Sequence, residues 1–459
     1  MNFEILEKTP LYDAFSDLGK RIFLPNGIIY WSGRAKKEAD LIGTIGTAFG
    51  YERDFIEGGT DDWTPCYLPE IKKFTELNVK DIVPYASIGG LAELRKIWKD
   101  LIVRKSMYND EIDKEKITHL KKYISNPIVT TGITNGIYLC AKLFLNSGEK
   151  IICTNKRWGN YDNIFTKNLG IDIKSFQFFK DNKINLEALK TVIFEVGKTQ
   201  NKIVMIINFP NNPTGFVPSK QEANDLIKLI RESQAQLKKP FIIIVDDAYE
   251  SYVFSEEALD ISLFYELQQL KEDIIPIKLD GVTKELLMYG ARIGFVTIGL
   301  KPNWISNNDE RKNLIKEINN KLEGINRSSI SNCNHIYQAI VVKIFQDAGI
   351  EKIIESRNKI KELLKKRYEK INLELSNISN PDISIDPNSG GFFLFVNLNK
   401  DKYKANEFAD HLLKNYKIGI IPIEKQAENI NGFRIAYCSI DINQISEFIK
   451  RIKSALTNY

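Results

Sequence analysis

The sequence predicts an α/β protein with a large domain, whose mostly parallel sheet is covered by helices, and a smaller α+β domain. Between residues 128 and 299, near-continuous apolar segments of strand length alternate with segments of helical periodicity. Such alternation is typical of a parallel sheet with helices on both faces. The 459 residues are enough for two domains. We expect residues 56–325 to form the large domain, residues 326–459 the small C-terminal domain, and residues 1–55 to join the small domain.

The predicted strands of the large domain are apolar segments that end in polar or glycine-containing turns. They span residues 128–131, 150–154, 173–179, 203–209, 241–247, 274–280 and 293–299. The predicted helices have apolar positions at helical spacing and span residues 91–103, 135–145, 185–196 and 219–234. Ligands of parallel sheets lie at the carboxyl ends of the strands, so we expect the functional site there.

The remaining elements lie towards the two ends of the chain. Near the N-terminus, Tyr30-Trp31-Ser32-Gly33 is predicted to form an aromatic-rich turn. Long helices are predicted over residues 303–321 and 334–368, where the chain leaves the large sheet. Beyond residue 370, short strands at 391–397 and 433–437 and helices at 405–416 and 445–456 predict the α+β domain.

Composition argues against several classes of protein. A net charge of +5 from 64 basic and 59 acidic residues does not favour a dedicated nucleic-acid binder. No apolar run approaches the length of a membrane span, and residues 1–8 lack the apolar core of a signal peptide. The five cysteines form no CxxC pair and the three histidines have no metal-ligand spacing. We therefore expect a cytoplasmic protein without a metal site, a disulfide framework, a membrane or a nucleic-acid partner.

One lysine and one arginine follow the predicted strand 274–280. Lys284 lies in the turn after this strand, and Arg292 follows eight residues later between Gly290 and Gly294. A lysine at a strand end can act as an amine nucleophile when its surroundings favour the neutral form. An arginine can bind a phosphate with two hydrogen bonds. Together they suggest a Schiff-base lysine beside a phosphate anchor, which is what pyridoxal phosphate (PLP) requires.

Two further strands end in polar residues. Asn212, in Asn211-Asn212-Pro213-Thr214-Gly215, follows the strand 203–209; the segment either forms a rigid turn or fixes the Asn212 amide as a donor to a ligand. Asp246 ends the next strand and precedes Asp247-Ala248-Tyr249. A buried carboxylate needs a positive partner, which a pyridinium nitrogen, a structural ion pair or a helix N-terminus could provide.

Two other segments have a functional and a structural interpretation. Thr131-Gly132-Ile133-Thr134 joins a strand to a helix, whose free N–H groups can bind an anion, although many turns also contain a glycine. Trp158, in Arg157-Trp158-Gly159, can cover the face of an aromatic ring or can belong to the core.

Four of these segments occur in a fixed order along the chain. Asn212-Pro213-Thr214-Gly215, Asp246-x-Ala248-Tyr249, Thr283-Lys284 and Arg292-x-Gly294, in this order, resemble the class I/II aminotransferases of PLP fold type I, the aspartate aminotransferase-like enzymes. The similarity covers roughly residues 80 to 440, and the combination is far more specific than any single segment.

The resemblance implies a role for each segment around PLP. Lys284 would form the Schiff base with the cofactor and act as the general base, and Asp246 would pair with the pyridine nitrogen. Asn212 and Tyr249 would contact the 3′-oxygen of the ring, and Trp158 would stack on the ring. Lys284, Asp246 and Tyr249 are thus the expected catalytic residues.

The phosphate and the assembly follow from the same resemblance. The backbone amides of Ile133 and Thr134, together with Thr283 and Arg292, would hold the phosphate. Tyr85, in Tyr85-x-x-x-Gly89-Gly90-Leu91-x-Glu93, resembles the tyrosine that reaches the phosphate of the neighbouring subunit. The implied protein is a homodimer with shared active sites.

Substrate contacts are implied for Arg434, Asn212, Trp158 and Arg327. Arg434, in Gly432-Phe433-Arg434-Ile435-Ala436, resembles the arginine that binds the α-carboxylate of the substrate. Arg327 lies four residues before Ser331-Asn332, the spacing at which aspartate aminotransferases have an arginine that reaches across the dimer to the substrate's side-chain carboxylate. The alternative is that Arg327 makes a helix-terminal or surface ion pair.

The chain departs from the family pattern at two positions. Gly281 stands where many relatives have a serine three residues before the lysine, so one phosphate-binding hydroxyl is missing. Tyr161 stands where aspartate aminotransferases have a histidine behind the aspartate, so the surroundings of Asp246 are expected to differ.

The expected activity is the transfer of an amino group between an amino acid and a 2-oxo acid. The alternative within PLP chemistry is a β-lyase, which would form pyruvate and ammonia without an oxo-acid acceptor. A non-enzymatic PLP-responsive transcription regulator would carry a DNA-binding domain first, and the residues before Tyr85 show no helix-turn-helix pattern. A doubly wound dehydrogenase is disfavoured because no GxGxxG follows the first strand.

Overall fold

The computed structural model describes residues 5–23, 27–73, 77–79, 82–107, 114–304 and 307–459. A seven-stranded sheet with the strand order β4-β12-β11-β10-β9-β5-β6 forms the centre of the larger part. Its strands are β4 (Ile128–Thr130), β5 (Lys150–Thr154), β6 (Asp172–Phe176), β9 (Ile203–Asn208), β10 (Phe241–Asp246), β11 (Ile274–Gly281) and β12 (Gly294–Ile298). Only β12 runs antiparallel to its neighbours, which confirms the predicted mostly parallel sheet.

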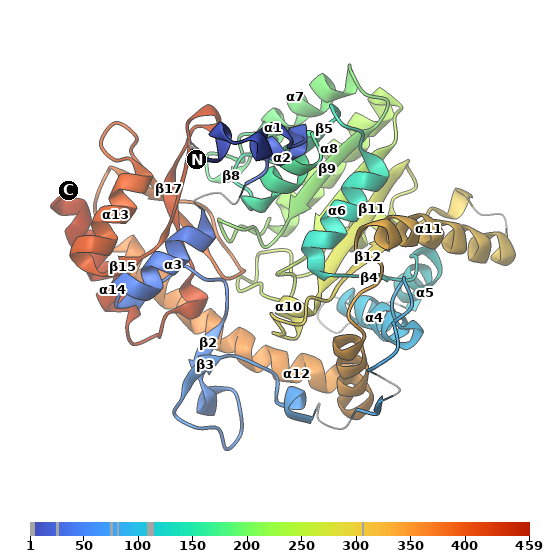
Figure 1. Cartoon of the computed structure of the whole chain (residues 1–459), viewed down its shortest axis with the longest axis horizontal. Helices are drawn as coiled ribbons and strands as arrows, with labels where there is room; N and C mark the ends of the chain where they lie inside the picture. The colour runs from blue at the N-terminus through green and yellow to red at the C-terminus, as the bar shows by residue number, and fades with distance from the viewer. Residues whose placement is uncertain (1–4, 24–26, 74–76, 80–81, 108–113, 305–306) are drawn as a thin grey trace.

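Helices cover both faces of this sheet, as predicted (Figure 1). Every residue of β9 and β10 is buried, because alternate side chains enter the cores on opposite faces. Val204, Ile206, Ile242 and Ile244 pack in the core that contains α6 (Gly132–Phe144), whereas Met205 and Ile243 pack on the other side. The helices on that other side are α4 (Ala92–Lys105), α7 (Leu186–Gly197), α8 (Lys220–Leu237) and α9 (Leu263–Gln269).

A second, four-stranded antiparallel sheet lies in the C-terminal part, at the left of Figure 1. Its order is β13-β14-β17-β16, from Ile383–Ile385, Leu394–Leu398, Ile430–Ile435 and Ile421–Lys425. Helix α13 (Ala405–Tyr416) packs on this sheet, and helix α14 (Ile445–Thr457) packs against α13. The N-terminal segment reaches the same region, because β1 (Leu41–Ile42) pairs in parallel with β15 (Ile418–Gly419). The domain boundaries themselves stay a prediction.

Long helices connect the two regions. Helix α11 (Asn308–Ser329) contacts β4 and α6, and α12 (His335–Ser376) contacts α4 of the larger part and α14 of the C-terminal part. Gly349, with φ 76°, interrupts the helical conformation of α12. The predicted helix 303–321 includes residues 305–306, which lie outside the described residues.

The structure corrects two local predictions. Residues 30–33 form no turn: they lie inside α3 (Ile28–Glu38), because Trp31, Ser32 and Ala35 bury one side of a helix. The predicted strand 173–179 ends at Phe176, and Phe179–Lys180 pairs instead with Lys183–Ile184 in a separate hairpin.

Candidate active site

The carboxyl ends of five parallel strands bring the predicted residues to one edge of the large sheet. Asp246 ends β10 and lies in register with Asn208 of β9 and Leu279 of β11. Lys284 follows β11 in the short helix α10 (Val282–Glu285), and Trp158 follows β5. The N-terminus of α6 follows β4. These positions agree with the expectation that a ligand site lies at the carboxyl edge.

Asp246 is a buried carboxylate with only 4% of its surface exposed. The Tyr161 hydroxyl donates to its Oδ2 at 2.5 Å, and the Ala248 amide donates to its Oδ1 at 3.2 Å. Burial raises the pKa of Asp246 to about 6, and the two hydrogen bonds act in the opposite direction. In the described part of the chain Asp246 has no ion-pair partner, so its charge is available to a cationic ligand.

Lys284 is an amine enclosed by aromatic rings. Its Nζ donates a short hydrogen bond to the Gly46 carbonyl and lies 4.5 Å from the ring centre of Tyr289, 5.0 Å from Phe392 and 5.5 Å from Tyr249. Burial lowers the pKa of Lys284 to about 7, and the nearby positive charges of two arginines add to this effect. At neutral pH a large fraction of the amine is therefore neutral and nucleophilic.

Arg434 is a guanidinium with only 2% of its surface exposed. Its Nη1 donates to Asn212 Oδ1 at 3.0 Å, its Nη2 donates to the Thr44 carbonyl at 2.7 Å, and the group lies 4.1 Å from the ring centre of Phe393. Its buried Nε has no partner among the described residues. Burial lowers the pKa of Arg434 to about 10. A buried cation without a carboxylate beside it is suited to receive an anionic ligand.

Asparagine side chains connect Asp246 to Arg434. Asn208 Nδ2 donates to the Asp246 carbonyl at 2.8 Å, and the backbone amide of Asn212 donates to Asn208 Oδ1 at 2.8 Å. The Asn212 side chain then accepts from Arg434. The turn after β9 is thus hydrogen-bonded both to Asp246 and to Arg434. Within the described chain, Asn212 Nδ2 has no hydrogen-bond partner and remains available as a donor.

A cluster of N–H groups and a guanidinium forms beside α6. Gly132, with φ 75°, begins this helix, and a Cβ there would collide with Arg292 Nη2. A Cβ at Gly294 would lie 2.7 Å from the Ile133 nitrogen, so glycine is needed at both positions. The guanidinium of Arg292 consequently lies against the helix end that carries Ile133 and Thr134. A helix N-terminus beside an arginine fits a phosphate group.

Trp158 and Gly281 complete the inner part of the site. The Trp158 ring lies edge-on to Tyr161, with ring centres 5.7 Å apart and planes at 82°, and it is half-buried against the core around α6. Gly281 is followed by Val282, Thr283 and Lys284. A Cβ at Gly281 would lie 2.7 Å from the Ile293 carbonyl oxygen, so the chain has no room for the serine found at this position in many relatives.

Two predicted residues lie apart from this cluster within the chain. Tyr85 is 92% exposed, and Arg327 is exposed in the last turn of α11, where it donates to Ser331 Oγ. They nevertheless lie on neighbouring segments. Asn326 donates to the Ile88 carbonyl at 3.0 Å, and Asn332 donates to the Ala86 carbonyl at 2.8 Å.

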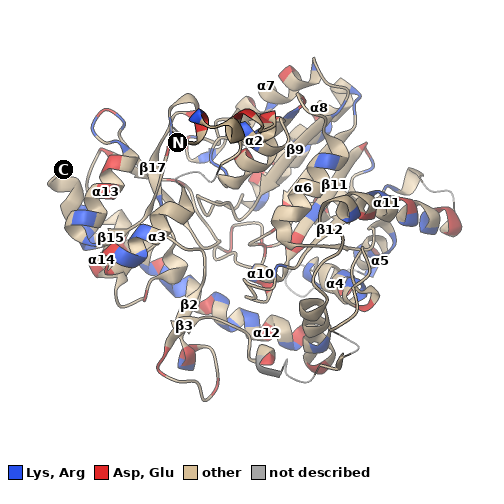
Figure 2. Ribbon diagram, viewed as in Figure 1, with Lys and Arg blue, Asp and Glu red and all other residues tan. Residues whose placement is uncertain are grey.

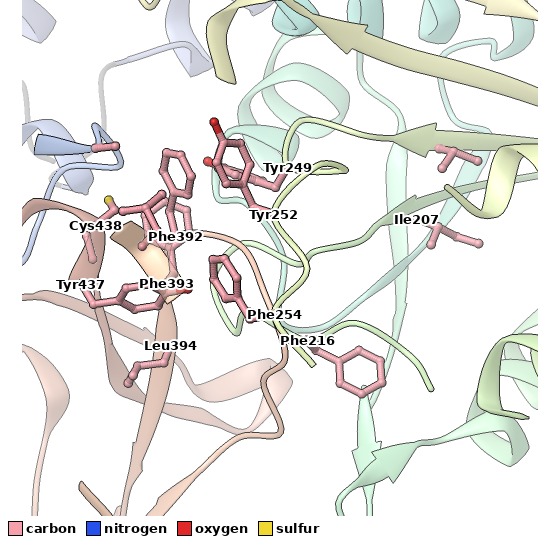
Figure 3. Packing of buried hydrophobic residues seen from close by; sticks show 14 of the residues in the cluster. Ile207, Phe216, Tyr249, Tyr252, Phe254, Phe392, Phe393, Leu394, Tyr437 and Cys438 are labelled. Atoms are coloured by element: carbon pink, nitrogen blue, oxygen red, sulfur yellow. The ribbon is translucent and has the colours of Figure 1, made fainter. Parts of the chain in front are cut away.

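Several residues at the site were not predicted from the sequence. Figure 3 shows Tyr249, from the turn after β10, beside Phe392 and Phe393, which precede β14. The Tyr249 ring lies 5.2 Å from Phe392 and 5.6 Å from Phe393. Gly46 permits this packing, since a Cβ there would lie 2.5 Å from Phe393 Cζ. The paired glycines before the two phenylalanines (Gly390-Gly391) were an available signal of close packing.

The charges of the molecule do not separate into one basic face in the view of Figure 2, where basic and acidic positions alternate along α4, α11 and α12. Within the described residues, no helix is both long and apolar enough to cross a membrane. The same part of the chain has no group of three or more His, Cys, Asp or Glu side chains arranged to hold a metal ion.

The family follows from comparison of the whole chain. Residues 79–452 match the family described as aminotransferase class I and II. The chain belongs to this family. Its fold is that of the PLP fold type I enzymes, and it is a PLP-dependent aminotransferase that acts on amino acids and 2-oxo acids.

The chain is similar to curated proteins and solved structures that carry aminotransferase names. The tyrosine aminotransferase of Dictyostelium discoideum is 25% identical over 360 residues, which cover 74% of this chain and 78% of that protein. A probable aspartate/prephenate aminotransferase of Rickettsia felis is 27% identical over 403 residues, covering 84% and 85%. An aminotransferase structure from Anaerococcus prevotii has a TM-score of 0.78 at 23% identity and covers 96% of this chain and 99% of its own.

The side chains of this aminotransferase fit PLP. Asp246 offers an unpaired buried carboxylate to a pyridinium nitrogen, and Lys284 offers a partly neutral amine to an aldehyde. The Arg292 guanidinium, which lies against Gly132 at the start of α6, offers a cation to the phosphate beside the N-terminus of that helix.

Proposed function

We propose that Lys284, Asp246 and Tyr249 are the catalytic residues of this aminotransferase and that Arg434 binds the α-carboxylate of the substrate. One relationship carries the proposal. Arg434 and Lys284 donate to the carbonyl groups of Thr44 and Gly46, which are two residues apart and therefore at most about 7 Å from each other. The two side chains thus converge on one short segment, where an α-amino acid would find a cation for its carboxylate and a base for its α-proton.

Each side chain then has a defined task. Bound PLP withdraws electrons from the α-carbon of the substrate. Arg434 holds the α-carboxylate, while the Lys284 amine accepts the α-proton and later returns it. Asp246 keeps the ring nitrogen protonated, since its buried charge has no other cation beside it among the described residues. Asn212 Nδ2 and the Tyr249 hydroxyl donate to the 3′-oxygen of the ring.

The remaining contacts hold the cofactor in place. Trp158, edge-on to Tyr161, covers one face of the ring. The amides of Ile133 and Thr134, the Thr283 hydroxyl and Arg292 bind the phosphate. The aromatic residues around Lys284 limit the access of water to the amine.

The proposed assembly is a homodimer in which Tyr85 completes the phosphate site of the other subunit. The exposure of Tyr85 agrees with this, because a side chain that is 92% exposed among the described residues is accessible to a second subunit. In a mixture of Lys284→Ala and Tyr85→Ala subunits, one site of each heterodimer contains both residues. Activity should therefore return on mixing, whereas an active monomer at assay concentration would contradict the assembly.

The proposed substrate class is the acidic amino acids, with Arg327 as the partner of the side-chain carboxylate across the dimer. Within the described chain Arg327 has a hydroxyl partner, Ser331, but no carboxylate partner. Its neighbours Asn326 and Asn332 are bonded to the segment that carries Tyr85. The segments that carry Tyr85 and Arg327 are therefore adjacent, and we infer that a second subunit docks on them. A guanidinium can bind a carboxylate with two hydrogen bonds, which an apolar substrate could not replace.

The test compares kcat/KM for aspartate or glutamate with that for a neutral amino acid. Arg327→Ala should lower the value for the acidic substrates by about 10- to 100-fold and leave the neutral substrate nearly unchanged. Lys316→Ala removes another exposed cation from α11 and serves as the control. An equal loss for both substrates, or no loss, would refute the acidic preference.

A spectrum titrated with amino acids and a screen of 2-oxo acids test the reaction itself. Loss of the cofactor's visible band with an amino acid, and its return with an oxo acid, are expected. Pyruvate and ammonia formed without an acceptor would indicate a β-lyase instead. A cytoplasmic location is also proposed, and it is supported by five cysteines that are all buried and free.

A further inference from the structure

A carboxylate follows each of the three proposed catalytic residues in the chain. Asp247 follows Asp246, Glu250 follows Tyr249, and Glu285 follows Lys284. All three carboxylates are buried. Their side chains do not enter the cofactor site but meet the cations of three different elements behind it. Those cations are Lys278 of β11, Lys105 of α4 and Arg357 of α12.

Lys278 binds the two carboxylates that come from the end of β10. Its Nζ donates to Asp247 Oδ2 through a short hydrogen bond and to Glu250 Oε2 at 2.8 Å. Ser262 Oγ donates to the same Asp247 oxygen at 2.6 Å. The Lys278 side chain is fully buried, so the strand that leads to Lys284 is fixed to the loop that contains Asp246 and Tyr249.

Lys105 connects that loop to the residue after Lys284. Its Nζ lies 2.7 Å from Glu250 Oε2 and 3.4 Å from Glu285 Oε2. Asp280 Oδ2 is 3.9 Å away, and Trp98 of the same helix donates to Asp280 Oδ1 at 2.8 Å. Lys105 is the last residue of α4. The end of this helix therefore contacts both the turn that follows Asp246 and the segment that follows Lys284.

Arg357 completes the network from α12. Its Nη1 donates a short hydrogen bond to Glu285 Oε1 and donates to Ser251 Oγ at 2.9 Å. Ser251 in turn donates to Glu285 Oε2 at 2.7 Å. The residue after Lys284 is therefore held by groups from three separate segments.

Stability alone does not account for such a network. Four carboxylates (Asp247, Glu250, Asp280 and Glu285) face three cations, and one oxygen of each of Asp247, Glu250 and Asp280 has no hydrogen-bond partner in the described chain. Replacing buried ion pairs with apolar residues of similar volume is often neutral or stabilising. The geometry that such a network imposes on the groups it joins is a second role for it, besides stability.

We propose that Lys105 and Lys278 are positioning residues, which hold Asp247, Glu250 and Glu285 and so fix the relative places of Asp246, Tyr249 and Lys284 in the cofactor site. The proposal rests on the roles proposed above for those three residues. Because Arg434 and Asn212 lie outside the network, substrate binding is independent of it.

The test uses the full-length protein with PLP bound. Lys105→Met removes the charge and keeps most of the side-chain volume, and Glu285→Gln removes the charge with almost no change of shape. Both variants should lower kcat by about 10- to 100-fold, since small misplacements at a reacting centre have effects of this size. KM should change by less than about twofold, and the visible circular dichroism of the cofactor, relative to its absorbance, should decrease.

Lys99→Met is the matched control. Lys99 is another partly buried lysine of α4, and its Nζ donates to the Ile124 carbonyl at 3.0 Å, away from the network. It should keep the wild-type kcat and dichroism even where its Tm falls. If Lys105→Met does not fold, Glu285→Gln decides alone.

A lower Tm with wild-type kcat and dichroism in the folded variants would overturn the proposal and leave a purely structural network. Borohydride trapping and peptide mass spectrometry in each variant keep this result separate from the roles proposed for the site. Cofactor trapped at a lysine other than Lys284 would contradict those roles, whereas cofactor trapped at Lys284 with unchanged kinetics would contradict the network alone.

Discussion

The Tyr161 hydroxyl donates a 2.5 Å hydrogen bond to Oδ2 of Asp246. Burial raises the pKa of Tyr161 well above its usual value, so this donor stays neutral throughout the physiological range. A histidine, which the resemblance places here in aspartate aminotransferases, could change its charge near neutral pH. In this protein the partner of Asp246 therefore supplies a hydrogen bond but never a positive charge.

Tyr161→Phe should make PLP binding more sensitive to acid. The hydroxyl opposes the rise in the pKa of Asp246, which stands at about 6, so its removal raises that pKa further. Asp246 is ionised above its pKa, and PLP affinity should thus begin to fall at a higher pH than in the wild type. Equilibrium dialysis of PLP between about pH 5 and pH 8 measures this, with Tyr138→Phe as control. An unchanged pH dependence would contradict the role of Tyr161.

Borohydride reduction should fix the cofactor covalently to Lys284. Because burial lowers the pKa of this lysine to about 7, attachment of added PLP to the cofactor-free protein should accelerate as the pH rises through about 7. An ordinary lysine would need a pH near about 10. Peptide mass spectrometry locates the bond, and trapping at another lysine in Lys284→Ala with the same absorption band would show that the assignment is wrong.

Arg434→Met should lower activity without lowering the stability of the protein. Loss of the α-carboxylate partner should lower kcat/KM by about 100-fold, mostly through KM. The unfolding midpoint in the absence of substrate should stay the same or rise, because the change removes a buried guanidinium that has no carboxylate partner in the described chain. Steady-state kinetics and thermal unfolding measure the two effects. A large fall in both would indicate that Arg434 mainly supports the fold.

Asp247→Asn should flatten the pH dependence of stability. Burial raises the pKa of Asp247 to about 7, despite Lys278, and the neighbouring Glu250 carboxylate adds to the rise; Ser262 and Tyr265 are the other polar groups nearby. Between about pH 4 and pH 7 the folded protein keeps a proton on Asp247 that the unfolded chain has lost, so the contribution of this group to the free energy of unfolding decreases as the pH rises. Asparagine does not titrate, so urea unfolding across this range should show the variant's free energy of unfolding without this decrease, relative to the wild type. If the free energy of unfolding depends on pH in the variant as it does in the wild type, the retained proton is on a group other than Asp247.

The sequence predicted those parts of the site that depend on short segments, namely a strand and the residues that directly follow it. The strand 203–209 is observed as Ile203–Asn208, and Asp246 and Lys284 follow from the rule that parallel strands present their carboxyl ends to one edge. Residues 30–33 were misassigned because Gly33 and two aromatic residues suggested a turn. Packing of Trp31 and Ala35 overrides this local preference and makes a helix.

The contacts between distant segments could not be predicted. Thr44 and Gly46 meet Arg434 and Lys284 across 390 and 238 residues, and no local pattern encodes such a pairing. Likewise, the network around Lys105 joins elements whose order in the chain gives no indication of contact. Of this network, the sequence shows only the carboxylate that follows each of the three proposed catalytic residues.

Gly281→Ser should destabilise the protein rather than strengthen phosphate binding. A Cβ at this position would lie 2.7 Å from the Ile293 carbonyl oxygen and 2.9 Å from Gly294 Cα, where β11 and β12 pair. Since the backbone of Gly281 is extended, the effect comes from the lack of space and not from strain in φ. Overpacking of this kind typically lowers the free energy of unfolding by about 1–3 kcal/mol. Gly290→Ser, at an exposed position with no heavy atom within 4 Å of the added Cβ, is the control. Urea unfolding and PLP titration distinguish the outcomes. If the serine tightens PLP binding without loss of stability, lack of space does not explain why this chain has glycine where many relatives have serine.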